Sequence, residues 1–357
     1  MSAFNFVLVL IAVYLLWTFT IRRGMRWLTC QRSFSRTRVF EGETGELVEV
    51  VRNDTPYLIP WFRVESRISP YIRLGKRTDL DVSGEMYYCS IFTLLPYQQI
   101  RRRHKVSFLH RGAYDLGNAA LTCGDALGVF RFFATQEERA PVLVYPRLLE
   151  PEELPLPVSR TLGELVRRQQ LLTDPFLVRG IRAYQPGDPV RDIHWAATAR
   201  TGEVQLRLRD YSARSRLLVV LNVQHQDIQM NNYVPESHWP WVEEGIRVAA
   251  SVCIQALRSG LSAGFATNMP MDQSQERTLL LPADGAAQEE ELLAAFARLN
   301  MKRTVRFPEL LEELEAYQDL DILLLSCYDS ESIRLCADKL RKAGNQVTFH
   351  CLEGGAR

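Results

Sequence analysis

The sequence predicts an α/β protein with an additional all-β domain, in the order N-terminal membrane helix, antiparallel β-sandwich-like domain and parallel α/β domain. Three observations lead to this fold class. An apolar run followed by arginines opens the chain, short alternating segments fill its first half, and strand-like and helical segments alternate in its last third. We expect the anchor with its basic flank at 1–30, the all-β domain at 31–150, a connector at 151–216 and the α/β domain at 217–357.

The composition is that of an ordinary globular protein. Of the 357 residues, 46% are hydrophobic and 24% charged, which suits two or three compact domains and excludes a wholly disordered chain. The net charge of +1 gives no reason to expect nucleic acid as a partner of the whole chain. The seven cysteines are odd in number and form no C-x-x-C pair, which argues against a disulfide framework or a zinc ribbon and favours a reducing compartment.

The first predicted element is a helix in residues 4–21, which are almost entirely apolar. Eighteen helical residues span about 27 Å, close to the thickness of the hydrocarbon core. A cleavable signal peptide is the alternative, but it would begin with basic residues, and none precedes the apolar run. Arg22, Arg23 and Arg26 follow the run instead. The positive-inside rule therefore predicts a single-pass anchor in the bilayer, with the bulk of the chain in the cytoplasm.

The second predicted region consists of short strands. β-forming residues, often with apolar and polar side chains in alternation, fill four short segments, at 47–51, 62–68, 85–95 and 101–108. Turn signals separate these segments, as in an antiparallel sandwich or barrel. The basic run 101–105 could bind nucleic acid or anionic lipid, or it could be the solvated face of one strand. We favour the solvated face, because no aromatic residues interleave with the run.

The connector holds an unusual segment at 179–200. Pro186, Gly187 and Asp188 are strong turn formers, and Arg182 and Arg191 flank the aspartate. This pattern supports two hypotheses. The segment could be a structural clasp between the domains, with Asp188 ion-paired and a large aromatic buried, or it could be an arginine-rich loop that docks a partner. Because turn formers occur together with a tryptophan, we favour the clasp.

The same segment resembles the signature of a bacterial family known as domain of unknown function 58. The matching positions are Arg182, Tyr184, Pro186, Gly187, Asp188, Arg191, Ile193, Trp195, Ala199 and Arg200. The family usually has Asp before the tryptophan and Lys after it, where this chain has His194 and Ala196. Segments 111–114 and 125–130 also resemble the family. Members often carry two membrane helices, whereas this sequence shows one.

The α/β region is predicted from alternating strand and helix patterns. Strands are expected at 217–223, 261–266, 278–281, 322–326 and 347–351, and helices at 241–260, 289–299, 310–317 and 333–343, with a further helix at 160–172 in the connector. Such alternation implies a parallel sheet with helices on both faces. The family resemblance implies that this region is a von Willebrand factor A-like domain.

Domains of that kind often hold Mg²⁺ through Asp-x-Ser-x-Ser after the first strand. The corresponding positions here are Asn222, Gln224 and Gln226. Three amides bring no charge to offset dehydration of the ion, so we expect a degenerate site with no metal and no cofactor. Ser326 and Cys327 end a later strand without a carboxylate, although Asp329 follows closely.

The chain contains none of the common catalytic or nucleotide-binding motifs, such as a Walker loop, G-x-S-x-G or H-E-x-x-H. A pair of His350 with Cys327, Cys336 or Cys351 is conceivable, but these cysteines lie in apolar predicted elements, so we do not expect an enzyme. The resemblance implies partnership with a MoxR-type AAA+ ATPase. We therefore expect a membrane-anchored, cytoplasm-facing adaptor that helps to assemble or mature an unidentified client protein. The alternatives are a metal-dependent, adhesion-type ligand-binding protein and a hydrolase.

Overall fold

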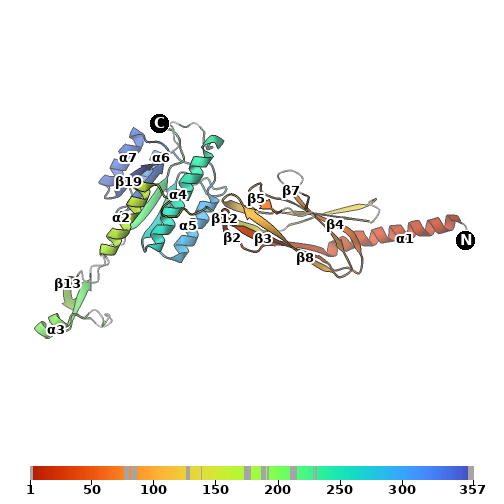
Figure 1. Cartoon of the computed structure of the whole chain (residues 1–357), viewed down its shortest axis with the longest axis horizontal. Coiled ribbons are helices and arrows are strands. Elements are labelled where there is room, and N and C mark those ends of the chain that lie inside the picture. The colour runs from red at the N-terminus through yellow and green to blue at the C-terminus, as the bar shows by residue number, and fades with distance from the viewer. Residues whose placement is uncertain are drawn as a thin grey trace. The chain divides into compact units, whose positions relative to one another are not determined.

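The computed structural model describes residues 3–75, 80–81, 87–125, 129–137, 139–172, 178–185, 190, 193–209, 215–227, 229 and 231–352. The chain forms two compact units, Met1–Arg147 and Leu148–Arg357 (Figure 1). The signature residues Pro186, Gly187, Asp188 and Arg191 lie outside the described residues.

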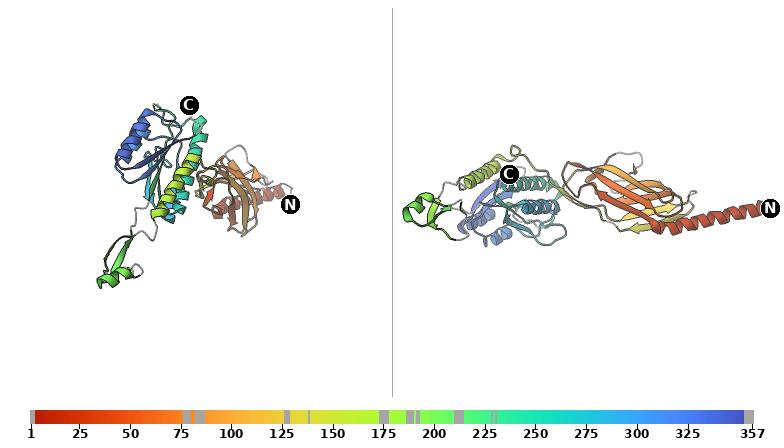
Figure 2. Two further views of the ribbon diagram at one scale, coloured as in Figure 1. Left: turned by 60° about the vertical axis from the view of Figure 1, so that its left-hand side comes forward. Right: turned by 90° about the horizontal axis from the view of Figure 1, so that it is seen from below.

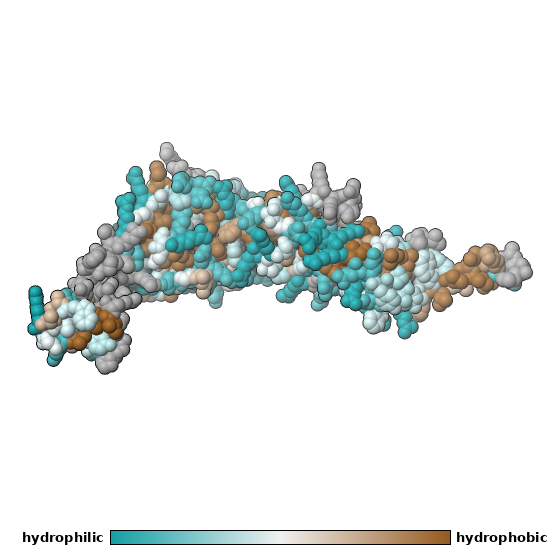
Figure 3. Space-filling model, turned by 60° about the horizontal axis from the view of Figure 1, so that its bottom comes forward, coloured by the Kyte–Doolittle hydropathy of each residue, from teal (hydrophilic) through white to brown (hydrophobic). Residues whose placement is uncertain are grey.

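The first unit begins with a long apolar helix, α1 (Ala3–Gly24), which continues into a short 3-10 helix, η1 (Met25–Trp27). The segment Phe4–Trp27 is long and apolar enough to cross a membrane or to act as a signal sequence. The large apolar side chains between Phe4 and Leu16 are at least half exposed, and this projecting stretch is coloured as hydrophobic in Figure 3. The predicted N-terminal apolar helix is therefore confirmed.

The rest of the first unit is a β-sandwich-like domain. Its strands are β1 (Leu28–Phe34), β2 (Arg38–Phe40), β3 (Thr44–Asn53), β4 (Ile59–Arg67), β5 (Ile72–Leu74), β6 (Leu80–Asp81), β7 (Tyr87–Leu94), β8 (Gln99–Phe108), β9 (Gly112–Asp115), β10 (Ala119–Gly124), β11 (Arg131–Gln136) and β12 (Pro141–Tyr145). Two antiparallel sheets have the orders β1-β3-β8-β5 and β11-β10-β4-β7-β6, and a smaller sheet has the order β2-β12-β9. The predicted antiparallel sandwich is confirmed, and the pair β2–β12 is parallel.

The two large sheets share one core. Leu28 and Val51 from the first sheet cluster with Phe62, Phe92 and Leu121 from the second. Strand β1 shows why its sequence forms this layer, because its residues alternate strictly between buried and exposed. The hydrophobic residues thus lie between the sheets.

The basic run on β8 is a solvated face, as predicted. Arg101, Arg103 and Lys105 are exposed, whereas His104 between them is buried. The His104 Nε2 atom lies 3.4 Å from the Oε2 atom of buried Glu49 on β3. The period of a strand therefore explains why alternate members of the run face solvent, whereas Arg102 and His104 point inward, the Arg102 guanidinium lying 4.1 Å from the centre of the Phe92 ring.

The second unit contains a five-stranded sheet between two layers of helices. Its elements are α2 (Leu156–Leu172), β13 (Val178–Ala183), α3 (Trp195–Thr201), β14 (Gln205–Arg209), β15 (Arg216–Leu221), η3 (Glu236–His238), α4 (Trp239–Arg258), β16 (Ser262–Thr267), β17 (Thr278–Ala283), α5 (Ala286–Arg298), α6 (Phe307–Leu314), β18 (Asp321–Ser326), α7 (Glu331–Lys342) and β19 (Gln346–Cys351). The sheet order is β17-β16-β15-β18-β19. Figures 1 and 2 show α4 and α7 on opposite sides of the sheet.

One strand corrects the prediction of a parallel sheet. β17 runs antiparallel to β16, whereas β16, β15, β18 and β19 are mutually parallel. The segment between β16 and β17 carries no helix, and a parallel neighbour would need a long crossover connection, usually through a helix. The sheet is therefore mixed, with an antiparallel edge.

The continuous apolar run of β15 reflects burial on both faces. Leu217, Val219 and Leu221 pack in the layer that contains α4 and α5, and Leu218 and Val220 pack in the layer that contains α6 and α7. Helix α2 belongs to the first of these layers through Val158, Leu162 and Leu165. Arg168 of α2 also pairs with Asp321 of β18 at 2.7 Å. The helix at 156–172 is thus part of the α/β core.

Candidate functional site

The first candidate site is the edge of the sheet where the parallel strands end. The strand order reverses at β15, with β16 and β17 on one side and β18 and β19 on the other. In open α/β sheets, ligands bind in the crevice outside the carboxyl ends of the strands at such a reversal. Asn222 and Gln224 follow β15 directly and are buried, whereas Gln226 is exposed.

The buried amides at this edge bond to one another. Asn222 Oδ1 accepts hydrogen bonds from the Gln224 backbone N–H at 3.0 Å and from Asn268 Nδ2 at 3.3 Å. Asn222 Nδ2 donates to Ser326 Oγ at 3.0 Å. Gln224 Oε1 accepts from Asn268 Nδ2 at 3.4 Å and from the backbone N–H of Phe307. We call Asn222, Gln224, Asn268 and Ser326 the amide network.

The sequence analysis missed Asn268, although a signal was present. Asn268 is the first residue after β16, so it ends beside Asn222 at the same edge of the sheet. Its Oδ1 accepts from the backbone N–H of Val223 at 3.2 Å, and its side chain is fully buried. Polar residues that directly follow neighbouring parallel strands could have identified it.

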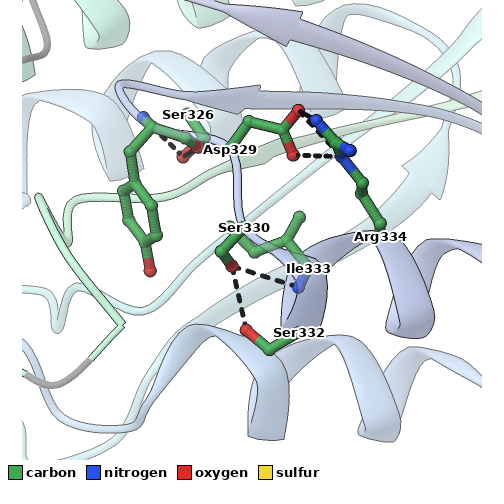
Figure 4. Close-up of polar contacts among 7 residues, drawn as sticks. Ser326, Asp329, Ser330, Ser332, Ile333 and Arg334 are labelled. Atoms are coloured by element: carbon green, nitrogen blue, oxygen red, sulfur yellow. Dashed lines mark hydrogen bonds and ion pairs between the residues drawn. The ribbon is translucent and has the colours of Figure 1, made fainter. Parts of the chain in front are cut away.

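The end of β18 offers no free carboxylate to this edge. Asp329 accepts from Arg334 Nε at 3.0 Å and from Arg334 Nη2 at 2.5 Å (Figure 4). Ser330 is the N-cap of α7 and accepts from the backbone N–H of Ile333 at 3.3 Å. The segment between β18 and α7 is thus held by its own contacts.

This donor set does not fit a divalent cation. The side-chain oxygens of Asn222 and Gln224 already accept N–H groups, so a cation would have to displace those donors, and neither amide brings a negative charge to balance it. Within the described ranges, no group of three or more His, Cys, Asp or Glu side chains is placed to hold a metal ion. The amide network therefore works as a hydrogen-bonded closure of the sheet edge.

Two histidines and a cysteine lie close to the amide network. The rings of His225 and His238 stack with their centroids 4.5 Å apart. Burial lowers the pKa of His225, and the neighbouring His238 and Arg303 lower it further. Burial raises the pKa of Cys327 to about 11, so its thiol stays protonated at neutral pH. Cys336 and Cys351 also have pKa values raised by burial. These thiols lack the depressed pKa that activates a cysteine nucleophile.

The second candidate site is the signature segment, which folds as an antiparallel pair of strands with a short helix. β13 pairs with β14, Ala183 opposite Gln205 and Arg182 opposite Leu206. The backbone N–H of Tyr184 donates to the Val204 carbonyl at 2.8 Å. We call β13, α3 and β14 the signature hairpin.

His194 explains one departure from the family pattern. It is the N-cap of α3, and its Nδ1 accepts a hydrogen bond from the backbone N–H of Ala197 at 3.1 Å. Aspartate is a preferred residue at this position because its side-chain oxygen can accept the same bond. His194 therefore performs the capping role that an aspartate would have. Gly202 ends the helix in the left-handed conformation at φ 75°.

The surface of the signature hairpin contradicts the clasp hypothesis at its main point. Trp195, which the clasp would bury, is 66% exposed, because it begins a two-turn helix that has no buried residue. Ile181, Val190 and Val204 are also exposed, at 47%, 65% and 42%. Arg200 is exposed too, and Arg182 and Ile193 are partly so. The proposed ion pairs of Asp188 with Arg182 and Arg191 lie outside the described residues.

Comparison with protein families gives one match. The model of a family described as "Protein of unknown function DUF58" matches residues 180–316, from β13 to just beyond α6. This match confirms the resemblance stated from the signature. No curated protein matches the chain.

Solved structures resemble the chain over about a third of its length. The CARDB domain of the PF1109 protein from Pyrococcus furiosus, solved with di-metal ions, is 18% identical and covers 33% of this chain and 91% of its own, with a TM-score of 0.22. The seventh ScaB type I cohesin from Pseudobacteroides cellulosolvens is 11% identical and covers 34% of this chain and 95% of its own, with a TM-score of 0.24.

Proposed function

We propose that this protein is a membrane-anchored adaptor whose signature hairpin docks a MoxR-type AAA+ ATPase on the cytoplasmic face of a bacterial inner membrane. The adaptor would bring the ATPase to a client protein that is being assembled or matured. The class of ATPase comes from the family resemblance, and the docking surface comes from the geometry of the hairpin.

The observation that carries the proposal is the exposure of Trp195. Tryptophan and arginine dominate the binding energy of protein interfaces, and large apolar side chains left in water commonly mark such interfaces. The signature hairpin presents Trp195 and Arg200 as exposed residues, with three further exposed apolar side chains. A sequence signature that leaves its largest side chain in solvent is better explained by contact with a partner than by stability.

The first candidate site supports a binding role without chemistry. The amide network satisfies its own oxygen atoms, which disfavours the metal-dependent adhesion alternative. The thiols near the sheet edge have raised pKa values, which disfavours the hydrolase alternative. Both arguments favour a scaffold that presents a docking surface.

The membrane part of the proposal follows from α1 and its basic flank. Helix α1 has 22 residues, or about 33 Å at 1.5 Å per residue, enough to cross the hydrocarbon core. Arg22 and Arg23 lie in its last turn and Arg26 follows. The positive-inside rule then assigns the bulk of the chain to the cytoplasm. In intact spheroplasts, we expect external protease to leave residues 30–357 uncut until lysis.

Site-specific photocrosslinking of the full chain in native membranes tests the docking surface. A benzophenone amino acid at Val204 of the signature hairpin should capture the ATPase, identified by mass spectrometry. The matched control is the same probe at Leu335 of α7, which is 58% exposed. Capture of the ATPase at Leu335 and not at Val204, or of no AAA+ ATPase at either position, would refute the proposal.

A further inference from the structure

The first unit contains a groove between the end of α1 and strand β11. It has a volume of about 710 Å³ and is lined by arginine and phenylalanine side chains, chiefly Phe19, Arg22, Arg23, Arg26, Arg131 and Phe133. We call it the arginine groove.

The arginine groove concentrates positive charge that the protein does not neutralise. Arg22, Arg23, Arg26 and Arg131 are exposed, and none of their guanidinium groups makes an ion pair or hydrogen bond with any residue that the structure describes. No acidic side chain lines the groove among the described residues. Guanidinium groups bind phosphate oxygens in a bidentate manner, so such a set is complementary to a phosphate anion.

The groove also presents two exposed aromatic rings beside its arginines. Phe19 is 57% exposed and Phe133 is 74% exposed, although aromatic side chains of this size are usually buried in soluble proteins. Inorganic phosphate or glycerol 3-phosphate would gain little from these rings. A phospholipid would, because its acyl chains can lie against them.

The β10–β11 hairpin lies along α1 over several helical turns. Near its tip, Asp125 accepts a hydrogen bond from the Tyr14 hydroxyl, and the rings of Tyr14 and Phe130 are 6.1 Å apart. Further from the tip, Arg131 and Phe133 line the groove together with Arg26 of η1, which lies twelve residues after Tyr14 in the chain. If α1 crosses the membrane up to its arginines, the tip of this hairpin enters the bilayer.

The exposed residues of the tip suit that position. Val129 is 65% exposed and Phe130 is 37% exposed. The one buried carboxylate, Asp125, has both oxygens bonded, since its Oδ1 accepts from the backbone N–H of Phe130 at 2.6 Å. The described residues of the tip thus offer apolar side chains and a satisfied carboxylate to the lipids.

We propose that the arginine groove binds one anionic phospholipid, with the phosphate held by the arginines of the groove and the acyl chains along its phenylalanine rings. The proposal rests on the membrane insertion of α1 in the proposed function, but not on the ATPase. The lipid would fix the β-sandwich-like domain to the bilayer surface at a second point besides α1.

The test uses the full chain in phosphatidylcholine nanodiscs that contain a trace of nitroxide-labelled lipid. Electron paramagnetic resonance measures the fraction of labelled lipid immobilised by the protein. We expect labelled phosphatidylglycerol to be preferred over labelled phosphatidylcholine by about fivefold or more, given roughly 1 kcal/mol for each basic residue near the surface. The preference should fall by about fivefold or more in the variant Arg26→Gln/Arg131→Gln, with a smaller preference left by the two remaining arginines. Arg22 and Arg23 are kept, so that the charge bias that orients α1 remains.

The matched control is Arg101→Gln/Arg103→Gln on β8, which removes two exposed arginines from a different sheet and should keep the preference. Equal immobilisation of both lipids by the parent protein, or equal loss in both variants, would overturn the proposal. Displacement of the lipid by millimolar glycerol 3-phosphate would replace it with a site for free phosphate. Failure of the chain to enter nanodiscs would refute membrane insertion as well, whereas a missing ATPase partner would leave the groove unaffected.

Discussion

Replacing Trp195 by serine should abolish partner docking without weakening the α/β core. An aromatic side chain buries roughly 150–250 Å² when fully covered. Because Trp195 is 66% exposed, about 100–165 Å² of that area remains for a partner to cover. At about 25 cal/mol per Å², this area corresponds to roughly 2.5–4 kcal/mol of binding free energy, or a loss of about 70- to 900-fold in affinity.

The core should be unaffected because no residue of the signature hairpin belongs to the two hydrophobic clusters that flank the five-stranded sheet, within the described ranges. The affinity can be measured by biolayer interferometry with the full chain in nanodiscs and the purified ATPase. Thermal unfolding of the same samples reports on the core.

Two control variants separate contact from folding. Leu335→Ser removes another exposed apolar side chain, from α7, and should change neither affinity nor unfolding. Leu206→Ser removes a buried apolar side chain of the hairpin, at 5% exposure, and should lose binding together with the hydrogen-exchange protection of β14. If Trp195→Ser binds the ATPase within threefold of the parent, the docking role is wrong. If it lowers the unfolding temperature of the core, the clasp interpretation returns.

Three further predictions concern stability and metal binding. Glu49→Ala should lower the unfolding free energy by about 1–3 kcal/mol, because it leaves the buried Tyr88 hydroxyl, which donates to Glu49 Oε1 at 3.0 Å, without its acceptor. Glu46→Ala at the exposed end of the same strand should cost less than about 1 kcal/mol in denaturant titrations. The pKa of His225 is lowered on folding, so the unfolded state binds more protons below about pH 6.5, and stability should fall as the pH drops below that value until it reaches the folded pKa. In pH-dependent melts, His225→Gln should flatten this profile. An equal slope in both proteins would count against the prediction. Calorimetric titration with Mg²⁺ should give only weak, non-saturating heats, unchanged by Asn222→Ala; a micromolar isotherm that this substitution removes would contradict the description of the amide network.

Much of the fold could be predicted because burial leaves a direct periodic trace. The unbroken apolar run of β15 marked a strand covered on both faces, and the alternation in β8 marked one solvated face. The direction of β17 left no such trace, since an edge strand has the same side-chain period whether it runs parallel or antiparallel. Only the absence of a helix in the connection before it carried that information.

The candidate sites were harder to predict than the fold. The sequence places the amides of Asn222 and Gln224 directly after a strand, but their bonds to Asn268 depend on which strands become neighbours. Trp195 was expected to be buried against one domain because large aromatic residues are usually buried. Burial depends on what packs against a residue, and among the described residues the short helix α3 has no buried side chain.

The two proposed surfaces have complementary physical roles. A docking contact centred on one tryptophan and a few apolar neighbours is small, and small interfaces are typically weak and transient. A membrane tether compensates for weak binding, because it keeps the protein and its client in the same membrane. Their encounter is then effectively intramolecular, and local concentrations reach the millimolar range for short linkages. The signature hairpin therefore need not bind the ATPase tightly, provided that α1 and the arginine groove hold the chain at the bilayer. On this reasoning, removal of α1 should leave the affinity of the purified chain for the ATPase unchanged and yet abolish its effect on membrane-bound clients.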